Sequence, residues 1–277
     1  MMRNIFLIVI CFNILYAVPK VKETTLLWEN GIQKLKYSWY FHSKTQKKVY
    51  HGKWTDFYPD GHVKTQKEFG QGILEGTVKS WDQKGVLRTS LVYENNIKHG
   101  LQQNYNPQGI LIEECILHRE IKNGLCRTFH ENGGVKEITS WSMGKRNGIR
   151  RLINSKGVIV LDASYKNGLV DGNYHTKYDN GESKLRTAFV LGKQEGIALY
   201  YDMTGKTIRA DRFLNNKLHG KTESWYPNKQ LKTKCYYLNG SKSGACKSWS
   251  NEGRLNYSQI WNNGKCMSEC NETKGAF

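Results

Sequence analysis

Two pairs of cysteines in this chain share one spacing, which points to the same covalent chemistry at two places. Each pair is 11 residues apart, and the second pair follows the first by 120 residues. Equal spacing predicts two equivalent disulfides, and the last two cysteines are paired by elimination. A zinc site is the alternative, which the lack of close CxxC pairs disfavours. The expected disulfides are Cys115–Cys126, Cys235–Cys246 and Cys266–Cys270.

A second set of residues is basic and recurs at one position of a 24-residue period. Side chains at equivalent positions of repeated strands form a row along a sheet, with a basic group about every 9.6 Å, or two strand spacings. Such a row would track a linear polyanion. The alternative is that the lysines provide solubility and protect strand edges. This row is Lys64, Arg88, Lys136, Lys184 and Lys232, and a second row ten residues later is Lys98, Lys122, Arg146 and Lys242.

Catalytic chemistry is not indicated. The sequence has no GxSxG, HExxH or P-loop motif, and no GxGxxG followed by a helical pattern. His51, His99 and His219 recur directly before a glycine of the period, which indicates a structural role within the repeat. We therefore expect a protein that is not an enzyme and that has no catalytic residue, metal site or cofactor.

The elements that position these residues follow from the spacing of glycine. Taking each periodic glycine as position 0 defines nine units over residues 52–267. Two further glycine columns lie at positions 9 and 20, and the three columns hold nine, eight and six of the 27 glycines. The starting glycines of units 1 to 9 are Gly52, Gly76, Gly100, Gly124, Gly148, Gly172, Gly196, Gly220 and Gly244.

Each unit contains two short apolar runs between turn signals. Positions 5 and 17 are mostly aromatic and position 11 is mostly branched. Segments such as YPDG at 58–61 and NNIK at 95–98 separate the runs, because Pro, Gly and Asn favour turns. Runs of this length between turns are strands. The predicted fold is all-β: an elongated single-layer antiparallel meander of about nine 24-residue β-hairpin repeats, with about 18 strands.

A single-layer sheet has no second sheet to cover its aromatic columns. We expect the aromatic side chains to pack on one another along the stack and to form the core. The alternative is a platform on which sugar rings or bases stack, for which the end rows with Trp249 and Trp261 are candidates.

Hairpin geometry supports the first two disulfides. A two-residue turn at positions 20 and 21 would place position 15 opposite position 2 of the next unit, where the paired cysteines lie. Directly opposed residues have Cβ atoms close enough to bridge. Because positions 2 and 5 would face opposite sides of a regular strand, we expect a bulge between them.

The pattern resembles MORN repeats. It consists of a glycine, an aromatic residue at position 5, a second glycine at position 9, an aromatic residue at position 17, and an NGK or NN turn before HG or NG. The period and segments such as KNGLVDG at 166–172 are most similar to the variant MORN repeats of bacterial antitoxin-like proteins, over about residues 52–264. The resemblance implies an elongated sheet that acts as a scaffold, a dimerisation element or a lipid-contacting surface.

The N-terminal segment is typical of a secretory signal peptide. Residues 1–17 combine Arg3, the apolar run IFLIVICFNILYA and the small residue Ala17. An uncleaved anchor is the alternative, for which the run is short. Cleavage would remove Cys11 and leave six cysteines in a secreted, extracellular chain, or in a periplasmic one if the host is bacterial.

The remaining segments flank the repeats. Residues 18–51 contain a degenerate capping repeat, with ENG at 29–31 and Trp39 at matching positions, and residues 268–277 form a C-terminal tail. N-glycosylation sequons begin at Asn239, Asn256 and Asn271 and would be used only in a eukaryotic secretory pathway.

The net positive charge of the chain is the main basis for the predicted function. The formal net charge is +18, which implies attraction to anionic partners. We predict a secreted, non-enzymatic repeat protein that binds an acidic protein, an anionic glycan or a membrane surface. Nucleic acid is a weaker candidate partner, and homo-oligomers fit the repeat. The alternative is an antitoxin or immunity-like protein that neutralises a partner toxin, for which the basic charge disfavours a basic nuclease as target.

Overall fold

The computed structural model describes residues 20–270, which form one antiparallel sheet. All regular structure in this range is strand, as predicted, and this range contains no helix that could cross a membrane. The strands are β1 (Lys22–Leu27), β2 (Gln33–Phe41), β3 (Lys48–Phe57), β4 (Val63–Gly70), β5 (Ile73–Trp81), β6 (Leu87–Glu94), β7 (Ile97–Tyr105), β8 (Leu111–His118), β9 (Ile121–Phe129), β10 (Val135–Ser142), β11 (Lys145–Ile153), β12 (Ile159–Lys166), β13 (Leu169–Lys177), β14 (Ser183–Val190), β15 (Lys193–Tyr201), β16 (Thr207–Leu214), β17 (Lys217–Leu218), β18 (Gly220–Trp225), β19 (Leu231–Leu238), β20 (Ser241–Trp249), β21 (Leu255–Asn262) and β22 (Lys265–Ser268).

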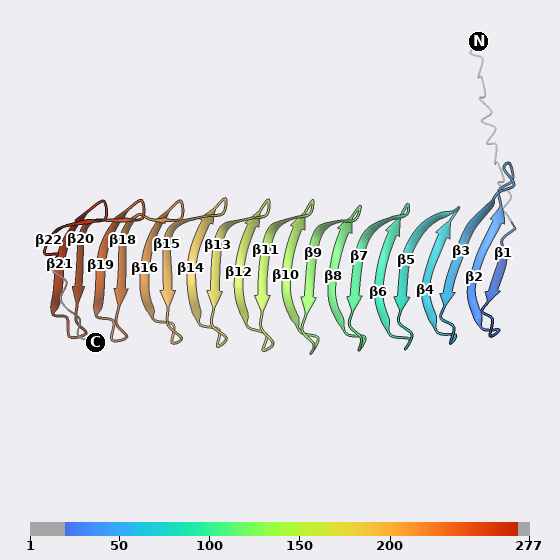
Figure 1. Ribbon diagram of the computed structural model, residues 1–277, viewed down its shortest axis with the longest axis horizontal. Coiled ribbons are helices and arrows are strands. Elements are labelled where there is room, and N and C mark those ends of the chain that lie inside the picture. The colour runs from blue at the N-terminus through green and yellow to red at the C-terminus, as the bar shows by residue number, and fades with distance from the viewer. Residues whose placement is uncertain (1–19, 271–277) are drawn as a thin grey trace, which may run out of the picture.

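Each strand pairs with its neighbours in the chain, so the topology is a meander. Figure 1 shows the strands side by side along the long axis, from β1 at one end to β22 at the other. The turns lie along two long edges, which we call the upper edge (positions 18–21) and the lower edge (positions 6–10). The predicted elongated single-layer sheet is thereby confirmed.

The nine units account for the strands from β3 to β21. β17 and β18 are halves of one strand, interrupted at His219, whose backbone N–H donates to the Arg212 carbonyl at 2.8 Å. Each unit therefore contributes two strands, as the sequence predicts. β1, β2 and β22 extend the sheet at its ends (Figure 1).

β1 and β2 have the geometry of a repeat unit. Lys22 lies opposite Trp39 just as Gly52 lies opposite Phe69. The lower turn at 28–32 has the same pair of backbone hydrogen bonds as the turn at 58–62. The upper connection is longer than in the other units, because residues 42–47 form a loop in place of a two-residue turn.

The upper-edge turns explain the Asn and Gly residues at positions 19 and 20. Both residues of these turns have positive φ, for example 52° at Asn95 and 65° at Asn96, as in a type I′ hairpin turn. Asn and Gly adopt this conformation at the lowest cost. The turn therefore begins one residue earlier than the predicted positions 20 and 21.

A bulge at the unit glycine restores the opposition of the cysteines. In β8–β9, Leu117 lies opposite Lys122 and Cys115 opposite Cys126, so β9 has two extra residues in this interval. Gly124 lies in the bulge with φ of 122°, and a Cβ there would lie 3.1 Å from a side-chain carbon of the neighbouring strand. The bulge therefore precedes position 2, instead of lying between positions 2 and 5 of the same strand as predicted.

The two faces of the sheet differ in burial. Positions 2, 13, 15 and 17 point to one face, here called the inner face, and positions 1, 3, 14 and 16 point to the outer face. The tightest packing is at positions 2 and 15, where Cys115, Ala163, Ala198 and Asp211 are at most 2% exposed. The core thus differs from the predicted aromatic stack, because small side chains fill its most buried sites.

The two aromatic columns lie on opposite faces. Position 17 belongs to the inner face, whereas at position 5 Trp249 lines a shallow outer-face hollow with Tyr236 and Lys247. Aromatic packing is concentrated at the N-terminal end, where the Trp54 ring lies 5.0 Å from Tyr37 and 5.7 Å from Phe69.

The predicted cysteine pairs all lie at disulfide distance. The first two pairs are directly opposed across a hairpin on the inner face. Their Cα atoms are 4.1 and 4.0 Å apart, and those of the third pair are 5.8 Å apart. The pairs are Cys115–Cys126, Cys235–Cys246 and Cys266–Cys270.

Candidate polyanion-binding surface

The first basic row lies beside the turns of the lower edge. In unit 1, Phe57 lies opposite Val63 and Asp56 opposite Thr65, which leaves Lys64 as the extra residue of a β-bulge. The other four basic residues of the row occupy the same bulge in their own units. All five except Arg88 are exposed, so their charges project from this edge into solvent.

In four of these five side chains the charged group contacts the residue six positions earlier in the chain. The ammonium groups of Lys64 and Lys184 lie 5.6 Å from the ring centroids of Tyr58 and Tyr178, and that of Lys232 lies 5.3 Å from Tyr226. In unit 2 the partner is a carboxylate, with Arg88 Nη1 at 3.6 Å from Asp82 Oδ2. Contact with a ring face holds a cation in place without neutralising it.

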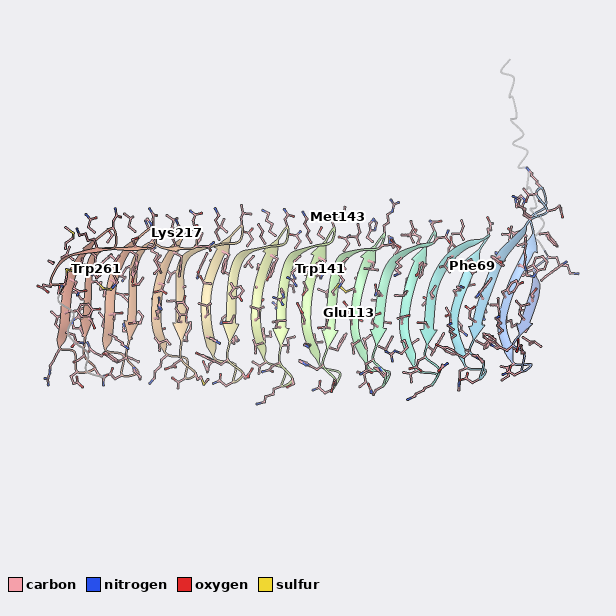
Figure 2. The ribbon with its side chains drawn as sticks, in the orientation of Figure 1. Phe69, Glu113, Trp141, Met143, Lys217 and Trp261 are labelled. Carbon is pink, nitrogen blue, oxygen red and sulfur yellow. A yellow bond between two sulfur atoms is a disulfide. The ribbon has the colours of Figure 1, made fainter. Side chains whose placement is uncertain are left out.

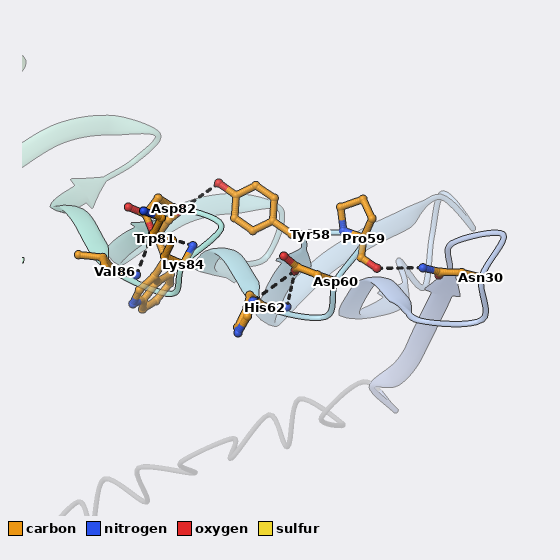
Figure 3. Close-up of polar contacts among 9 residues, drawn as sticks. All are labelled: Asn30, Tyr58, Pro59, Asp60, His62, Trp81, Asp82, Lys84 and Val86. Carbon is orange, nitrogen blue, oxygen red and sulfur yellow. Dashed lines mark hydrogen bonds and ion pairs between the residues drawn. The ribbon is translucent and has the colours of Figure 1, made fainter. Parts of the chain in front are cut away.

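The tyrosines at position 6 link consecutive units. The Tyr58 hydroxyl donates to the Trp81 carbonyl at 2.9 Å (Figure 3). The Tyr226 hydroxyl makes the equivalent hydrogen bond to the Trp249 carbonyl at 3.1 Å. An aspartate at this position instead closes its own turn, because Asp82 Oδ1 accepts the N–H groups of Lys84 and Val86 at 3.0 Å. A tyrosine at position 6 thus joins its turn to the next unit.

The row is sparser than predicted. The predicted spacing of about 9.6 Å holds only between Lys64 and Arg88, since the other members are two units apart, about 19 Å at four strand spacings. The intervening position-12 residues of units 3, 5, 7 and 9 are Ile112, Val160, Ile208 and Asn256. The lower edge therefore presents separated cationic points and not a continuous track.

The second basic row lies on the inner face among the aromatic residues. The charged groups of Lys122 and Arg146 lie 5.4 and 5.6 Å from the ring centroid of Trp141, and that of Lys242 lies 4.5 Å from the ring centroid of Trp261. Figure 2 labels Trp141 and Trp261 on the sheet. Lys122 also pairs with Glu113 at 3.0 Å. These cations cover the aromatic rings of the sheet, so their first role is packing.

Two further ion pairs anchor inner-face acids. Arg150 Nε lies 2.8 Å from Glu137, and Arg209 Nε lies 2.8 Å from the buried Asp211. Burial opposes ionisation of Glu137, but hydrogen bonds from Arg150 and Thr139 hold its pKa below the ordinary value. The hydrogen bond to Asp211 raises the pKa of Arg209. These charges are therefore used within the fold.

The repeated histidines serve the upper-edge turns. His51 Nδ1 accepts the Gln71 N–H at 3.3 Å, and His219 Nδ1 lies 3.3 Å from Asn239 Oδ1. The ring of His99 packs against that of His118, with centroids 4.8 Å apart. Within residues 20–270, no group of three or more His, Cys, Asp or Glu residues is arranged to hold a metal ion.

Two of the three predicted glycosylation sites lie in the described range. Asn239 is exposed in the β19–β20 turn, and Asn256 is exposed at position 12 of β21. Asn271 lies outside the described residues, as do the predicted signal peptide at 1–17 and the tail beyond Cys270.

The repeats identify the family. Residues 50–70, 122–142 and 218–239 match the family model described as MORN repeat variant. Each match begins two residues before a unit glycine, so all three share the frame of the 24-residue period. The chain therefore contains variant MORN repeats at these three positions. No curated protein matches it.

Similarity to solved structures is weak. Crystal structures of TcdB2-TccC3-Cdc42 and of TcdB2-TccC3 share 10% and 11% identity with this chain, at TM-scores of 0.19 and 0.13. The matches cover 87% and 88% of this chain but 16% and 18% of those chains. This chain thus spans less than a fifth of their length, and the likeness carries no argument about fold or function.

Proposed function

We propose that the protein is a non-enzymatic binding protein that engages an acidic protein, an anionic glycan or an anionic membrane surface through its basic sheet. The observation that carries the proposal is the lower edge, where basic side chains emerge from equivalent bulges and three of them lie over tyrosine rings. Such fixed cations lose little conformational freedom when an anion binds.

The overall charge supports the same proposal. The formal net charge of +18 is large for a single-layer sheet of 277 residues. Attraction of this kind raises the rate of encounter with an anionic partner and weakens with salt.

Replacing the lower-edge row tests the proposal. We expect K64Q/R88Q/K136Q/K184Q/K232Q to keep the fold and to flatten the salt dependence of binding to heparin or anionic vesicles. On duplex DNA each neutralised contact contributes about 0.9 to the log–log slope. The control is K53Q/K79Q/K145Q/K193Q/K247Q, which removes equal charge from exposed lysines elsewhere.

Equal effects of the two sets would show that net charge alone matters. Absence of salt-sensitive binding to either probe would overturn an anionic glycan or membrane partner and leave an acidic protein as the partner to test.

We further propose that the protein is secreted. The three cysteine pairs at disulfide distance support an oxidising compartment, because such bonds persist outside the cytosol. Expression with the native N-terminus tests this. Recovery from the medium of a chain that begins near residue 18 is the expected outcome, and retention of residues 1–17 in a membrane fraction would contradict it.

A further inference from the structure

An outer-face hollow lies at the middle of the array. It has a volume of about 500 Å³ and spans β11 to β14. Small side chains of Ser164 and Asn173 line it, whereas at the equivalent positions of the preceding unit pair the larger Ile116 and Leu125 occupy this space. The hollow is therefore a feature of units 5 and 6 and not of every repeat.

Four charged or polar side chains cross the hollow in register. Arg151 lies opposite Asp162, Asp162 opposite His175, and His175 opposite Arg186, so the four residues form one line across four strands. With a neutral imidazole, two guanidinium groups and one carboxylate leave this line with one net positive charge.

The contacts within the protein do not use all the hydrogen-bonding capacity of these four side chains. Arg151 Nε lies 3.3 Å from Asp162 Oδ2, but the buried Nε–H has no acceptor in hydrogen-bond geometry within residues 20–270. His175 Nε2 lies 3.1 Å from Ser183 Oγ and 3.5 Å from Arg186 Nε. Arg186 lies beside the His175 ring and Arg151 lies beyond Asp162, so one guanidinium stands on each side of the Asp162–His175 pair.

We propose that this hollow binds a single carboxylate, supplied by an acidic side chain of a protein partner. One net positive charge matches one carboxylate, and the planar guanidinium group of Arg186 suits carboxylate oxygens in geometry. A linear polyanion would need the same arrangement in successive units, but the equivalents of Asp162 and His175 two units earlier are Glu114 and Arg127, already paired at 2.7 Å. The inference rests on the proposed function and selects the acidic protein among its partners.

The protonation of the His175 imidazole can report whether the site is occupied. Burial lowers the pKa of His175, and Arg186 and Lys177 lower it further, while Asp162 acts in the opposite direction. Arg151 is the remaining charged group that lines the hollow. A carboxylate bound beside the ring adds a negative charge and raises the pKa of His175.

The test compares two double variants with equal charge loss on the outer face. The probe is a hexaglutamate peptide, with heparin as the second arm. We expect R151Q/R186Q to weaken peptide binding about tenfold or more, as the loss of charged hydrogen bonds implies. The control R127Q/R212Q should change it by no more than about twofold, as expected for surface charges. The imidazole resonance of His175, followed by NMR, should titrate at higher pH with peptide present.

Each outcome decides between the proposals. If both variants lose equal affinity, or if the pKa of His175 does not change when the peptide is present, the carboxylate site is wrong while a diffuse basic surface that binds anions still stands. If heparin binds and hexaglutamate does not, the partner is a glycan and the site is again wrong. If neither probe binds the wild type, the carboxylate site and the proposed anionic partner both fail.

Discussion

The N-terminal end and the two cysteine hairpins have different contacts between the opposed residues at positions 15 and 2 of the inner face. Tyr37 and Trp54 are directly opposed across β2–β3, at the same positions, 15 and 2, as Cys115 and Cys126 across β8–β9. In the first case two aromatic rings stack with centroids 5.0 Å apart, and in the second the sulfur atoms lie at bonding distance. The 15–2 pair is thus the site at which each hairpin is closed on the inner face.

Other hairpins have different contacts between positions 15 and 2. In β10–β11, Thr139 lies opposite Arg150, and both bind Glu137. In β12–β13 the pair is Ala163 and Tyr174. A single-layer sheet has no opposing layer to fill gaps, so each hairpin needs its own local contact. This contact is covalent, aromatic or ionic in different hairpins.

The largest expected effect is at the aromatic end. Trp54→Ala should destabilise the protein by about 3–4 kcal/mol, because it removes the ring on which Tyr37, Tyr50 and Phe69 pack. In a repeat array the damage should remain local. Hydrogen exchange should therefore accelerate in β1 to β4 and stay unchanged beyond β12.

The matched control is Trp81→Ala, at position 5 on the outer face. We expect a smaller loss there, of about 1 kcal/mol, since no ring of the aromatic cluster packs on it. Equal losses would show that the aromatic cluster contributes nothing beyond burial of one side chain.

Removal of a cysteine pair should have the next largest effect. C115A/C126A and C235A/C246A should each cost about 3 kcal/mol, because both pairs close loops of the same sequence separation, 11 residues. C266A/C270A, which closes a separation of 4, should cost less, about 2 kcal/mol. Urea unfolding of oxidised protein measures all three. Unequal losses for the first two variants would show that local packing and not loop closure dominates.

The hairpin closed by the Glu137–Arg150 ion pair should lose stability at acid pH. The pKa of Glu137 is lowered in the folded state, so its contribution is present above the unfolded value, near 4.3, and is lost as pH falls through the folded value. Wild type should lose about 1 kcal/mol more than E137Q between about pH 5 and pH 3. Thermal unfolding across this range measures the difference, and R150Q should abolish it.

The smallest expected effect concerns the lower edge, where side chains join consecutive units. Tyr226→Phe removes the hydrogen bond to the Trp249 carbonyl and should cost about 1 kcal/mol in urea unfolding. Tyr236→Phe is the control, because Tyr236 is an exposed tyrosine of the outer face and does not lie in a turn of the lower edge. A loss as large in the control would show that the link between turns is not stabilising.

The repeat, the fold class and the cysteine pairing could be predicted from the sequence. Each follows from local chemistry that recurs: glycines where φ is positive, apolar residues in short runs, and cysteines at equal spacing. The cysteine pairing was predicted correctly although the turn begins one residue earlier than predicted. The earlier turn alone would shift the strand register, but the bulge at Gly124 adds two residues to β9 and brings Cys126 opposite Cys115.

Tertiary structure alone decided which side chains share a face and what each charge contacts. Sequence periodicity places Lys64 in a row, but only the bulge and the ring of Tyr58 determine where its ammonium group lies. The hollow beside His175 depends on small residues from adjacent strands about ten residues apart in the chain, none of which follows a motif. Such properties depend on strand register and twist, which are set by the sum of many cross-strand contacts and not by any single segment.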